Sequence, residues 1–474
     1  MAPTGGHNDS DPLESYGVSE DCLHANIWKP KTNGGALPVV VWIHGGGFMV
    51  EAGSKPAYWG DMLVTLTDSP VIMVSFNYRM GIFGFYSSDD AGANFGFLDQ
   101  QMLLRYVRDN IGSFGGDPAR VTIVGQSAGA MSVLCHLAAP ASAGLFARAV
   151  AASPVGLWYR TPAENAPFVR TVAAAVGCTG ANVTACLRSR PAHVLSLADI
   201  VPEYLFHVTG PCPECDNFLP WLPVVDGVSL PRSPPAAIRL GEHHRVPTIV
   251  STMRNETLAF LPTLLEKAGD NELAFELLMN ALYKDRAPAV KEHYARAVDT
   301  AGMRRGVSLL GVASTDSLMT CYARRLAQLL SAHGPTYLST FLYAPHGSEM
   351  NADALCVEGG PNGAACHAGD VAYILPQSAR MSARSGIAYQ AGEASFALTY
   401  SRSVVAFATD APHPFVPYAA AADVSTAWDI SGATTASSYH GPHCDFFDSA
   451  GFPSHPWGEG EDGNAAPSSL RRAE

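Results

Sequence analysis

The stretch VTIVGQSAGA, residues 121–130, decides the fold class and the chemistry that the sequence predicts. Its first four residues are β-branched and mostly apolar and predict a short buried strand, and the mostly apolar residues 130–137 predict a helix that follows. Between them, Ser127 stands in the pattern Gly-x-Ser-x-Gly. This strand–turn–helix context raises a Ser hydroxyl above a sheet, where it acts as a nucleophile, and the helix directs its positive end toward a developing negative charge. Ser127 is therefore the predicted nucleophile.

A glycine-rich segment upstream, HGGGF at residues 44–48, directly follows the strand predicted at residues 37–43. A Ser hydroxyl attacks a carbonyl carbon only if a base takes its proton and N–H donors hold the resulting oxyanion. Successive glycines leave their backbone N–H groups uncovered by side chains. With Ser127 downstream, we interpret this segment as an oxyanion hole rather than as an ordinary flexible loop.

The remaining elements predict an α/β protein. Strands are expected at 71–76, 247–251 and 337–342, and helical segments at 98–111, 260–294 and 315–331. Apolar strands that alternate with helices indicate a mostly parallel central sheet with helices on both faces. Because the chain shows no internal repeat and no change of composition that would mark a linker, residues 1–451 are predicted to form a single domain. Residues 452–474, rich in Gly, Pro, Ser and Glu, are predicted to be a disordered tail.

Composition and charge exclude several classes of protein. The 474 residues are 47% hydrophobic and 15% charged, which is typical of a well-buried globular chain. The net charge is −13 and the basic residues form no cluster, so nucleic acid is not expected as a partner. No stretch reaches the roughly 20 apolar residues of a membrane helix, so no transmembrane segment is expected. The first nine residues do not resemble a signal peptide.

Ten cysteines are many for a reducing compartment. We expect a Cys178–Cys186 disulfide, and a second between Cys356 and Cys366. The single C-x-x-C, at residues 212–215, lacks the second pair that a zinc site requires, so no metal is expected. The cysteine content favours secretion of the full-length protein, although the sequence carries no signal peptide.

Several ordered motifs together resemble the type-B carboxylesterase/cholinesterase family. They are EDCL at 20–23, HGGGF at 44–48, NYRMG at 77–81, NFGFLD at 94–99, NIGSFGGDPARVTIVGQSAGA at 110–130 and PVVDG at 223–227. The resemblance runs from about Ser19 to Ser153 and continues in scattered blocks to Cys444. It implies the α/β-hydrolase fold and hydrolysis of small carboxylic esters without a metal or organic cofactor. It also implies that the backbone N–H groups of Gly46, Gly47 and Ala128 are the oxyanion donors.

In this fold the catalytic residues follow the order Ser, acid, His. The family places a Glu shortly after a strand, and Glu256 fits that position, although Asn255 and Thr257 replace the usual neighbours. Residues 255–257 also form an N-x-T glycosylation sequon. If Glu256 is buried beside the histidine, Asn255 is expected to be too enclosed to carry a glycan.

Two histidines compete for the role of the base. His367 begins HAGDVAYIL, which keeps the family's acid three residues later and the apolar tail after it. His346 begins HGSEM, which matches the family locally but follows directly on a strand and lacks that tail. We favour His367 as the base, with Glu256 holding its ring, and keep His346 as the alternative. Ser153 corresponds to a second family Ser near the site, and its role is open between support of the triad and simple packing.

The chain departs from the family before the EDCL block, where it has only about twenty residues. Cys22 therefore lacks its family partner and is expected to be free, and a sheet edge is expected to be unpaired. The short start suggests truncation, and nothing supports a choline ester as substrate. The sequence predicts no oligomeric state, and the loops at 212–222 and 260–265 do not reveal which ester fits. A catalytically inactive binding protein of the same family and a lipase or polyester hydrolase remain alternative interpretations.

Overall fold

The computed structural model describes residues 19–31, 35–157, 159–196, 219–260, 272–295, 305–344, 356, 364–385 and 391–449. His346, the C-x-x-C cysteines and the tail at 452–474 lie outside these ranges, so the predictions made for them stay predictions. The prediction of one domain over residues 1–451 also stays a prediction.

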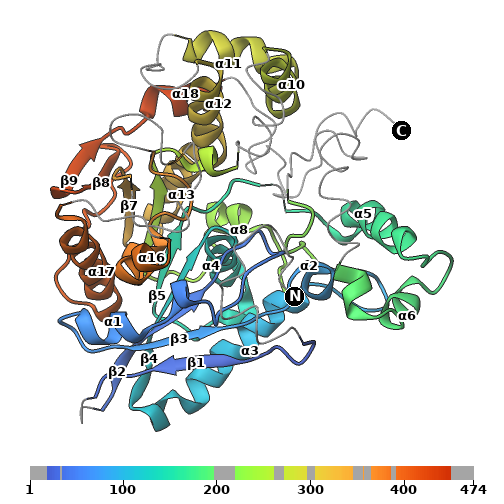
Figure 1. The fold of residues 1–474 in the computed structure, drawn as a ribbon, viewed down its shortest axis with the longest axis horizontal. Helices are drawn as coiled ribbons and strands as arrows, with labels where there is room; N and C mark the ends of the chain where they lie inside the picture. Colours follow the sequence, from blue (N-terminus) through green and yellow to red (C-terminus); the bar gives the residue numbers. More distant parts are fainter. Residues whose placement is uncertain are drawn as a thin grey trace.

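The centre of the described structure is a nine-stranded sheet in the order β1-β3-β2-β4-β5-β6-β7-β8-β9 (Figure 1). Every neighbouring pair from β3 to β8 is parallel, while β1 and β9 pair antiparallel at the two edges. This confirms the predicted mostly parallel sheet. The strands are β1 Ala25–Trp28, β2 Leu37–Ile43, β3 Ile72–Phe76, β4 Gly116–Gln126, β5 Arg148–Ala152, β6 Thr248–Met253, β7 Thr336–Phe341, β8 Val424–Asp429 and β9 Gly432–Ser437.

The strand that carries the predicted nucleophile is longer than its apolar run. The sequence predicts residues 121–124, whereas β4 begins at Gly116, where it pairs with Leu37. The pairing shifts between Leu37 and Val39, and the partly polar residues before Val121 extend the strand beyond its buried part. In this first half, β4 pairs with β2 at Gly116 alone, and the regular pairing begins at Val121.

Helices cover both faces of the sheet, as predicted. Alternate side chains of β2 divide between two cores: Val39, Val41 and Ile43 pack with α3, α4 and α13, whereas Val40 and Trp42 pack with α1, α15 and α17. The helices are α1 Asp61–Leu66, α2 Gly81–Phe85, α3 Phe95–Asn110, α4 Ala128–Ala138, α5 Pro162–Ala175, α6 Val183–Arg188, α8 Pro234–Leu240, α10 Glu272–Tyr283, α11 Ala287–Tyr294, α12 Arg305–Thr315, α13 Cys321–Ser331, α15 Val371–Ile374, α16 Ser378–Ser385, α17 Glu393–Thr409 and α18 Gly441–Ser449.

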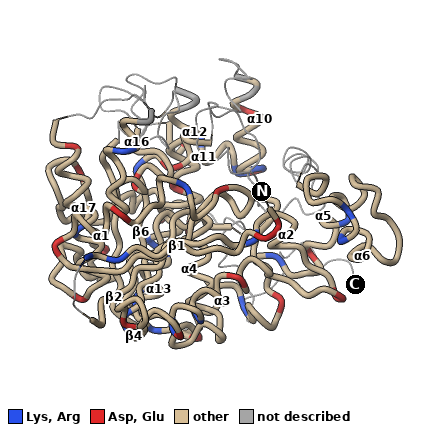
Figure 2. Tube along the Cα trace, turned by 60° about the horizontal axis from the view of Figure 1, so that its bottom comes forward, with Lys and Arg blue, Asp and Glu red and all other residues tan. Residues whose placement is uncertain are grey.

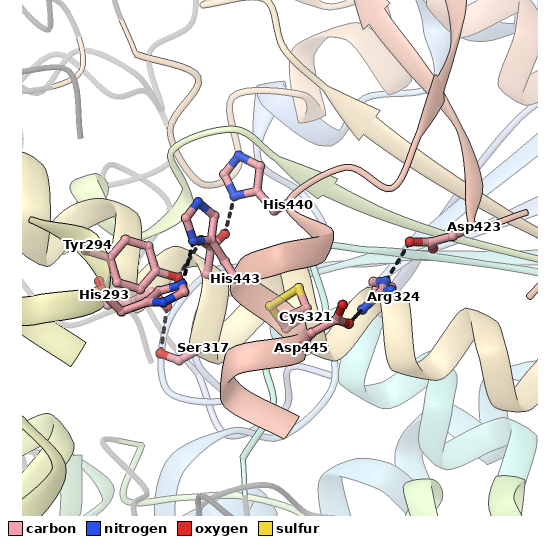
Figure 3. Close-up of a disulfide and its surroundings, with 12 residues drawn as sticks. His293, Tyr294, Ser317, Cys321, Arg324, Asp423, His440, His443 and Asp445 are labelled. Atoms are coloured by element: carbon pink, nitrogen blue, oxygen red, sulfur yellow. Dashed lines mark hydrogen bonds and ion pairs between the residues drawn. A yellow bond between two sulfur atoms is a disulfide. The ribbon is translucent and has the colours of Figure 1, made fainter. Parts of the chain in front are cut away.

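A smaller core lies beyond the sheet, among α10, α11, α12 and α18, which gather at the top of Figure 1. A π-helical turn, Asp316–Thr320, joins α12 to α13. The Cys321–Cys444 disulfide joins α13 to α18, and Arg324 bridges Asp423 and Asp445 beside it (Figure 3). The last described helix, α18, is therefore joined to α13 by a disulfide and by the ion pair between Arg324 and Asp445.

Both predicted disulfides, Cys178–Cys186 and Cys356–Cys366, are confirmed. Across the described residues, Cys22 and Cys135 are free, as predicted for Cys22. Charged residues are scattered along the described chain with no basic stripe (Figure 2). None of the described helices is both long enough and apolar enough to span a membrane.

Candidate active site

Ser127 occupies a sharp turn between β4 and α4. Its backbone has φ 60° and ψ −124°, a conformation that an L-residue with a side chain rarely adopts. The turn is held by the Ser127 N–H, which donates to the carbonyl oxygen of Ala152 at 2.9 Å. Ser127 is partly exposed, while its neighbours on both sides are buried. The fold therefore keeps one polar side chain accessible in a buried turn.

The two glycines of the motif are required by close backbone contacts. A Cβ atom on Gly125 would lie 2.3 Å from the carbonyl oxygen of Gly129. A Cβ atom on Gly129 would lie 2.0 Å from the carbonyl oxygen of Ile43, the last residue of β2. A side chain on Gly125 would collide with the backbone of α4, and one on Gly129 with the backbone at the end of β2. The spacing Gly-x-Ser-x-Gly is thus a steric requirement of this turn.

The glycine-rich segment leaves β2 beside this turn, because Ile43 pairs with Gly125 in parallel register. A Cβ atom on Gly45 would lie only 3.0 Å from the Ser127 Cβ atom. Gly46 and Gly47 have φ of 95° and 61°, in the region that glycine tolerates best. Among the described residues, the backbone N–H groups of Gly46, Gly47 and Ala128 have no hydrogen-bond acceptor. These are the three donors that the family resemblance implies.

The start of this segment is fixed by a buried aromatic stack. The His44 ring lies 4.4 Å from the Tyr78 ring, centroid to centroid, and the Tyr78 hydroxyl donates to the His44 carbonyl oxygen at 2.8 Å. The His44 Nδ1 atom lies 3.0 Å from the carbonyl oxygen of Gly45. Burial lowers the pKa of His44 to about 4, so its ring is neutral at neutral pH. The glycine-rich segment therefore begins at a histidine whose ring is held in place by its contacts and is uncharged at neutral pH.

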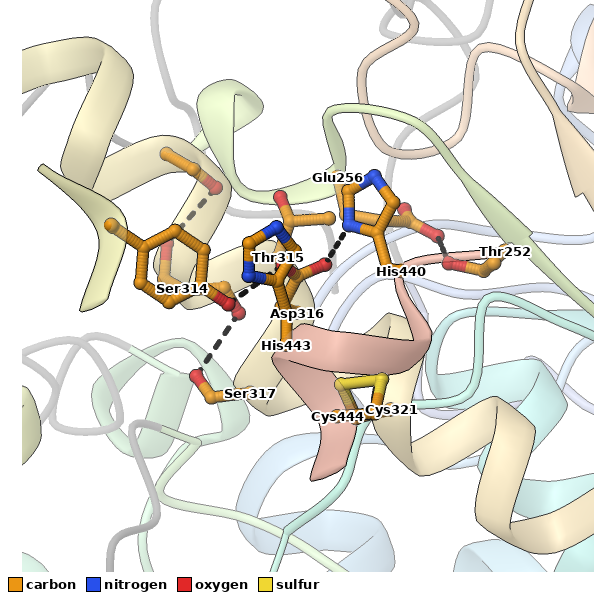
Figure 4. Close-up of polar contacts among 12 residues, drawn as sticks. Thr252, Glu256, Ser314, Thr315, Asp316, Ser317, Cys321, His440, His443 and Cys444 are labelled. Atoms are coloured by element: carbon orange, nitrogen blue, oxygen red, sulfur yellow. Dashed lines mark hydrogen bonds and ion pairs between the residues drawn. A yellow bond between two sulfur atoms is a disulfide. The ribbon is translucent and has the colours of Figure 1, made fainter. Parts of the chain in front are cut away.

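Glu256 begins a short 3-10 turn, Glu256–Ala259, after β6 and is fully buried. Its Oε1 atom accepts hydrogen bonds from the Met253 N–H at 2.7 Å and from the Thr252 hydroxyl at 3.2 Å (Figure 4). Its Oε2 atom lies 2.7 Å from His367 Nδ1. The carboxylate is therefore held on one side by the strand end and points its second oxygen at the imidazole.

The contacts of His367 define its tautomer. A carboxylate only accepts hydrogen bonds, so Nδ1 carries the proton that it donates to Glu256. In the neutral ring, Nε2 is then left with a free electron pair. Nε2 lies 3.3 Å from the side-chain nitrogen of Gln126, the residue directly before Ser127. His367 is only 6% exposed. The structure thus brings Glu256, His367 and the turn of Ser127 together, while His346 lies outside the described residues.

Three further residues lie near the site, and the sequence analysis assigned none of them a role in the reaction. Gln126 contacts His367 as described, and the Phe260 ring lies 5.1 Å from the His367 ring, centroid to centroid. Asp370 is buried, and burial together with the negative charge of Glu256 raises its pKa to about 7. Gln126 could have been found from its place in the motif. Phe260 begins one of the two loops expected to form the substrate pockets, and Asp370 is the acid three residues after His367 in HAGDVAYIL, so the sequence placed both near the site without giving either a role.

Ser153 follows β5 and is also close in the fold. It is fully buried, with φ 54°, and its N–H donates to the Ser251 carbonyl oxygen at 2.8 Å. Its hydroxyl oxygen has no hydrogen-bond partner within the described part of the chain. No contact links this hydroxyl to the other site residues, so its role stays open. Of the loops expected to form the substrate pockets, residues 219–222 and Phe260 are described, and Leu219 Cδ2 lies 3.1 Å from the Cβ position of Gly47.

Comparisons with known proteins show which family the chain belongs to. The model of the carboxylesterase family matches residues 2–439. The chain belongs to the carboxylesterase family. Carboxylesterase 1E of Mus musculus is 34% identical over 362 residues, covering 71% of this chain and 62% of the mouse protein. Crystal protein of Dictyostelium discoideum is 39% identical over 251 residues, which cover 52% of this chain and 44% of the Dictyostelium protein.

Among solved structures, a PNB esterase aligns with a TM-score of 0.71 and 28% identity, covering 90% of this chain and 84% of that chain. The predicted α/β-hydrolase fold is therefore confirmed. The chain spans about three fifths of the length of mouse carboxylesterase 1E and less than half of the Dictyostelium protein. Within the described residues, no group of three or more His, Cys, Asp or Glu is placed to bind a metal ion.

Proposed function

We propose that this carboxylesterase-family chain hydrolyses carboxylic esters through a Ser127–His367–Glu256 triad and an acyl-enzyme intermediate. The observation that supports this most strongly is the hydrogen bond of 2.7 Å between His367 Nδ1 and Glu256, which leaves Nε2 as a base beside the turn of Ser127. A carboxylate at Nδ1 holds the ring in this tautomer and stabilises the imidazolium that forms during the reaction.

In the first half of the reaction, Ser127 Oγ bonds to the carbonyl carbon of the ester while its proton passes to His367 Nε2. The carbonyl oxygen becomes an oxyanion, and the N–H groups of Gly46, Gly47 and Ala128 hold it. Loss of one such donor typically costs about 3 kcal/mol, or on the order of a hundredfold in rate. His367 then gives its proton to the departing alkoxide, which leaves as the alcohol.

In the second half, His367 takes a proton from water as the water oxygen attacks the acyl carbon. The C–O bond to Ser127 breaks, the proton returns to Ser127 Oγ, and the carboxylic acid leaves. No cofactor takes part in either half. The neutral His44 behind the glycine-rich segment places no charge beside the developing oxyanion.

The test is hydrolysis of p-nitrophenyl esters of increasing acyl chain length by the full chain and by Ser127→Ala. We expect release of p-nitrophenol that the substitution abolishes. A preference for short chains would favour a carboxylesterase, and a preference for long chains a lipase or polyester hydrolase. No hydrolysis of any ester by folded protein would instead favour a catalytically inactive binding protein.

We also propose that the full-length protein is secreted. The three disulfides among the described residues support this, because such bonds persist in oxidising compartments. Free-thiol counting on the unreduced, denatured protein from its native source tests the proposal. Protection of the six bridged cysteines is expected, and six reactive thiols at these positions would contradict it.

A further inference from the structure

Two segments distant in sequence pair through their backbones beside the proposed base. The Asn255 N–H donates to the Ala365 carbonyl oxygen at 3.0 Å, and the His367 N–H donates to the Glu256 carbonyl oxygen at 3.2 Å. Residues 364–366 belong to no helix or strand. The position of His367 against Glu256 therefore depends on these pairings and on the Cys356–Cys366 disulfide rather than on the sheet.

The Asn255 side chain completes this pairing. Its Oδ1 atom accepts the Ala365 N–H at 3.3 Å and the Arg254 Nε–H at 3.1 Å. Ala365 is fully buried, and among the described residues its N–H has no other acceptor. A buried N–H that loses its acceptor typically costs about 1–3 kcal/mol, so without this oxygen the segment would move to find another partner. The segment that would move carries His367.

We propose that Asn255 is a positioning residue for the base: its side-chain oxygen fixes the backbone at Ala365 and so keeps the His367 imidazole on Glu256. This inference rests on the proposed function and extends it to a residue outside the triad. In the described structure the side-chain oxygen of Asn255 contacts Ala365 and Arg254 rather than Ser127 or His367, so it acts through the segment that it holds. A displacement of about 1 Å in a catalytic group can cost on the order of a hundredfold in rate.

The test compares Asn255→Ala with Asn255→Asp in the full chain. Both substitutions remove the glycosylation sequon, but only the Asp side chain keeps an acceptor oxygen at the same place. We expect Asn255→Ala to lower kcat about 10–100-fold with KM changed less than about threefold. The lower pKa of the kcat–pH profile should also fall, because a looser bond to Glu256 stabilises the imidazolium less. Asn255→Asp should restore kcat to within about fivefold, and its added negative charge should move that pKa upward.

A matched control comes from Asn94, which lies outside the triad. Its side-chain oxygen accepts a hydrogen bond from a backbone N–H of a distant segment, as that of Asn255 does. The Asn94 Oδ1 accepts the Val224 N–H at 2.8 Å, and its Nδ2 donates to the Val224 carbonyl oxygen at 2.8 Å. Asn94→Ala should lower the melting temperature but leave the lower pKa of the profile unmoved. If Asn255→Ala yields no folded protein, Asn255→Gln, which displaces the oxygen by one methylene, should show the same fall in that pKa.

The proposal is overturned if Asn255→Ala loses thermal stability as Asn94→Ala does but keeps the parent kcat and pH profile. It is also overturned if Asn255→Asp is as impaired as Asn255→Ala. Ser127→Ala and His367→Ala, assayed in parallel, separate the two failures. If both are inactive while Asn255→Ala behaves like the parent, the positioning role fails and the triad stands. If Ser127→Ala retains activity, the proposed function itself fails.

Discussion

At the scale of single residues, the local sequence predicted the turn of Ser127 because its requirements are steric and short-range. Gly125 and Gly129 must lack side chains, and the structure shows the carbonyl oxygens that a side chain would strike. The proposed acid, Glu256, and the proposed base, His367, have no such local requirement, since they lie 111 residues apart and meet through β6 and the segment before α15. The family resemblance supplied their order, but no local pattern could reveal Asn255 as the residue that joins their segments.

The competition between the two histidines gives a prediction at this scale. His367→Ala should lower kcat by about 10⁴-fold or more, because Ser127 then has no proton acceptor. His346→Ala should change it by less than about tenfold. Steady-state kinetics on a p-nitrophenyl ester measures both, and Ser127→Ala/His367→Ala should cost little beyond either single change. A loss of activity in His346→Ala with His367→Ala still active would move the base to His346.

At the scale of elements, strands β2, β3, β6 and β7 lie within a residue or two of their predicted bounds. Strands β2 and β3 are nearly continuous apolar runs, as strands buried on both faces are. Strands β1 and β5 were not predicted. Strands β8 and β9 were missed as well. They are rich in Ser, Thr and Ala, and β9 is mostly exposed, so neither shows such a run. The expected helix at 315–331 proved to be a π-helical turn followed by α13, a distinction that side-chain periodicity does not encode.

The disulfide between α13 and α18 gives a prediction about these elements. Its cysteines are 123 residues apart in sequence, which is why it was not predicted, whereas Cys178 and Cys186 are eight apart. In the chain-entropy model the long loop contributes about 5 kcal/mol to stability and the short one about 2.5 kcal/mol. Urea unfolding of Cys321→Ala/Cys444→Ala should therefore show a larger loss than that of Cys178→Ala/Cys186→Ala. Equal losses, or a larger loss for the short loop, would show that loop length does not govern their contribution.

At the scale of the whole molecule, buried ionisable groups predict how stability depends on pH. Burial lowers the pKa of His136 to about 3 and of His44 and His243 to about 4. Unfolding at pH 4–6.5 therefore takes up protons at these histidines, and their contribution to stability is lost as the pH falls below about 6.5. Asp370 acts in the opposite direction: its pKa is raised to about 7, so its contribution falls as the pH rises from about 4 to 7.

The effect of the three histidines on stability should outweigh the opposite effect of Asp370. The melting temperature should therefore rise between pH 4.5 and 6.5 and change little above pH 7. The difference in free energy of unfolding between Asp370→Asn and the parent should be about 2–4 kcal/mol more favourable to the variant at pH 8 than at pH 5. The reason is that the substitution removes a carboxylate that is charged and buried at pH 8. Thermal unfolding followed by circular dichroism across this range measures both effects. A melting temperature that falls from pH 4.5 to 6.5 would contradict the expectation that the three histidines outweigh Asp370. An equal effect of Asp370→Asn on stability at pH 5 and pH 8 would contradict the role of Asp370.

The central proposal for the whole molecule is that Ser127 is a nucleophile activated by His367. Only an activated Ser reacts with an organophosphonate at neutral pH, so intact-mass and peptide mass spectrometry after treatment with a fluorophosphonate tests this directly. We predict one adduct per chain, located on Ser127, absent from Ser127→Ala and greatly slowed in His367→Ala. An adduct on another residue, or labelling that persists in Ser127→Ala, would contradict the assignment of the nucleophile.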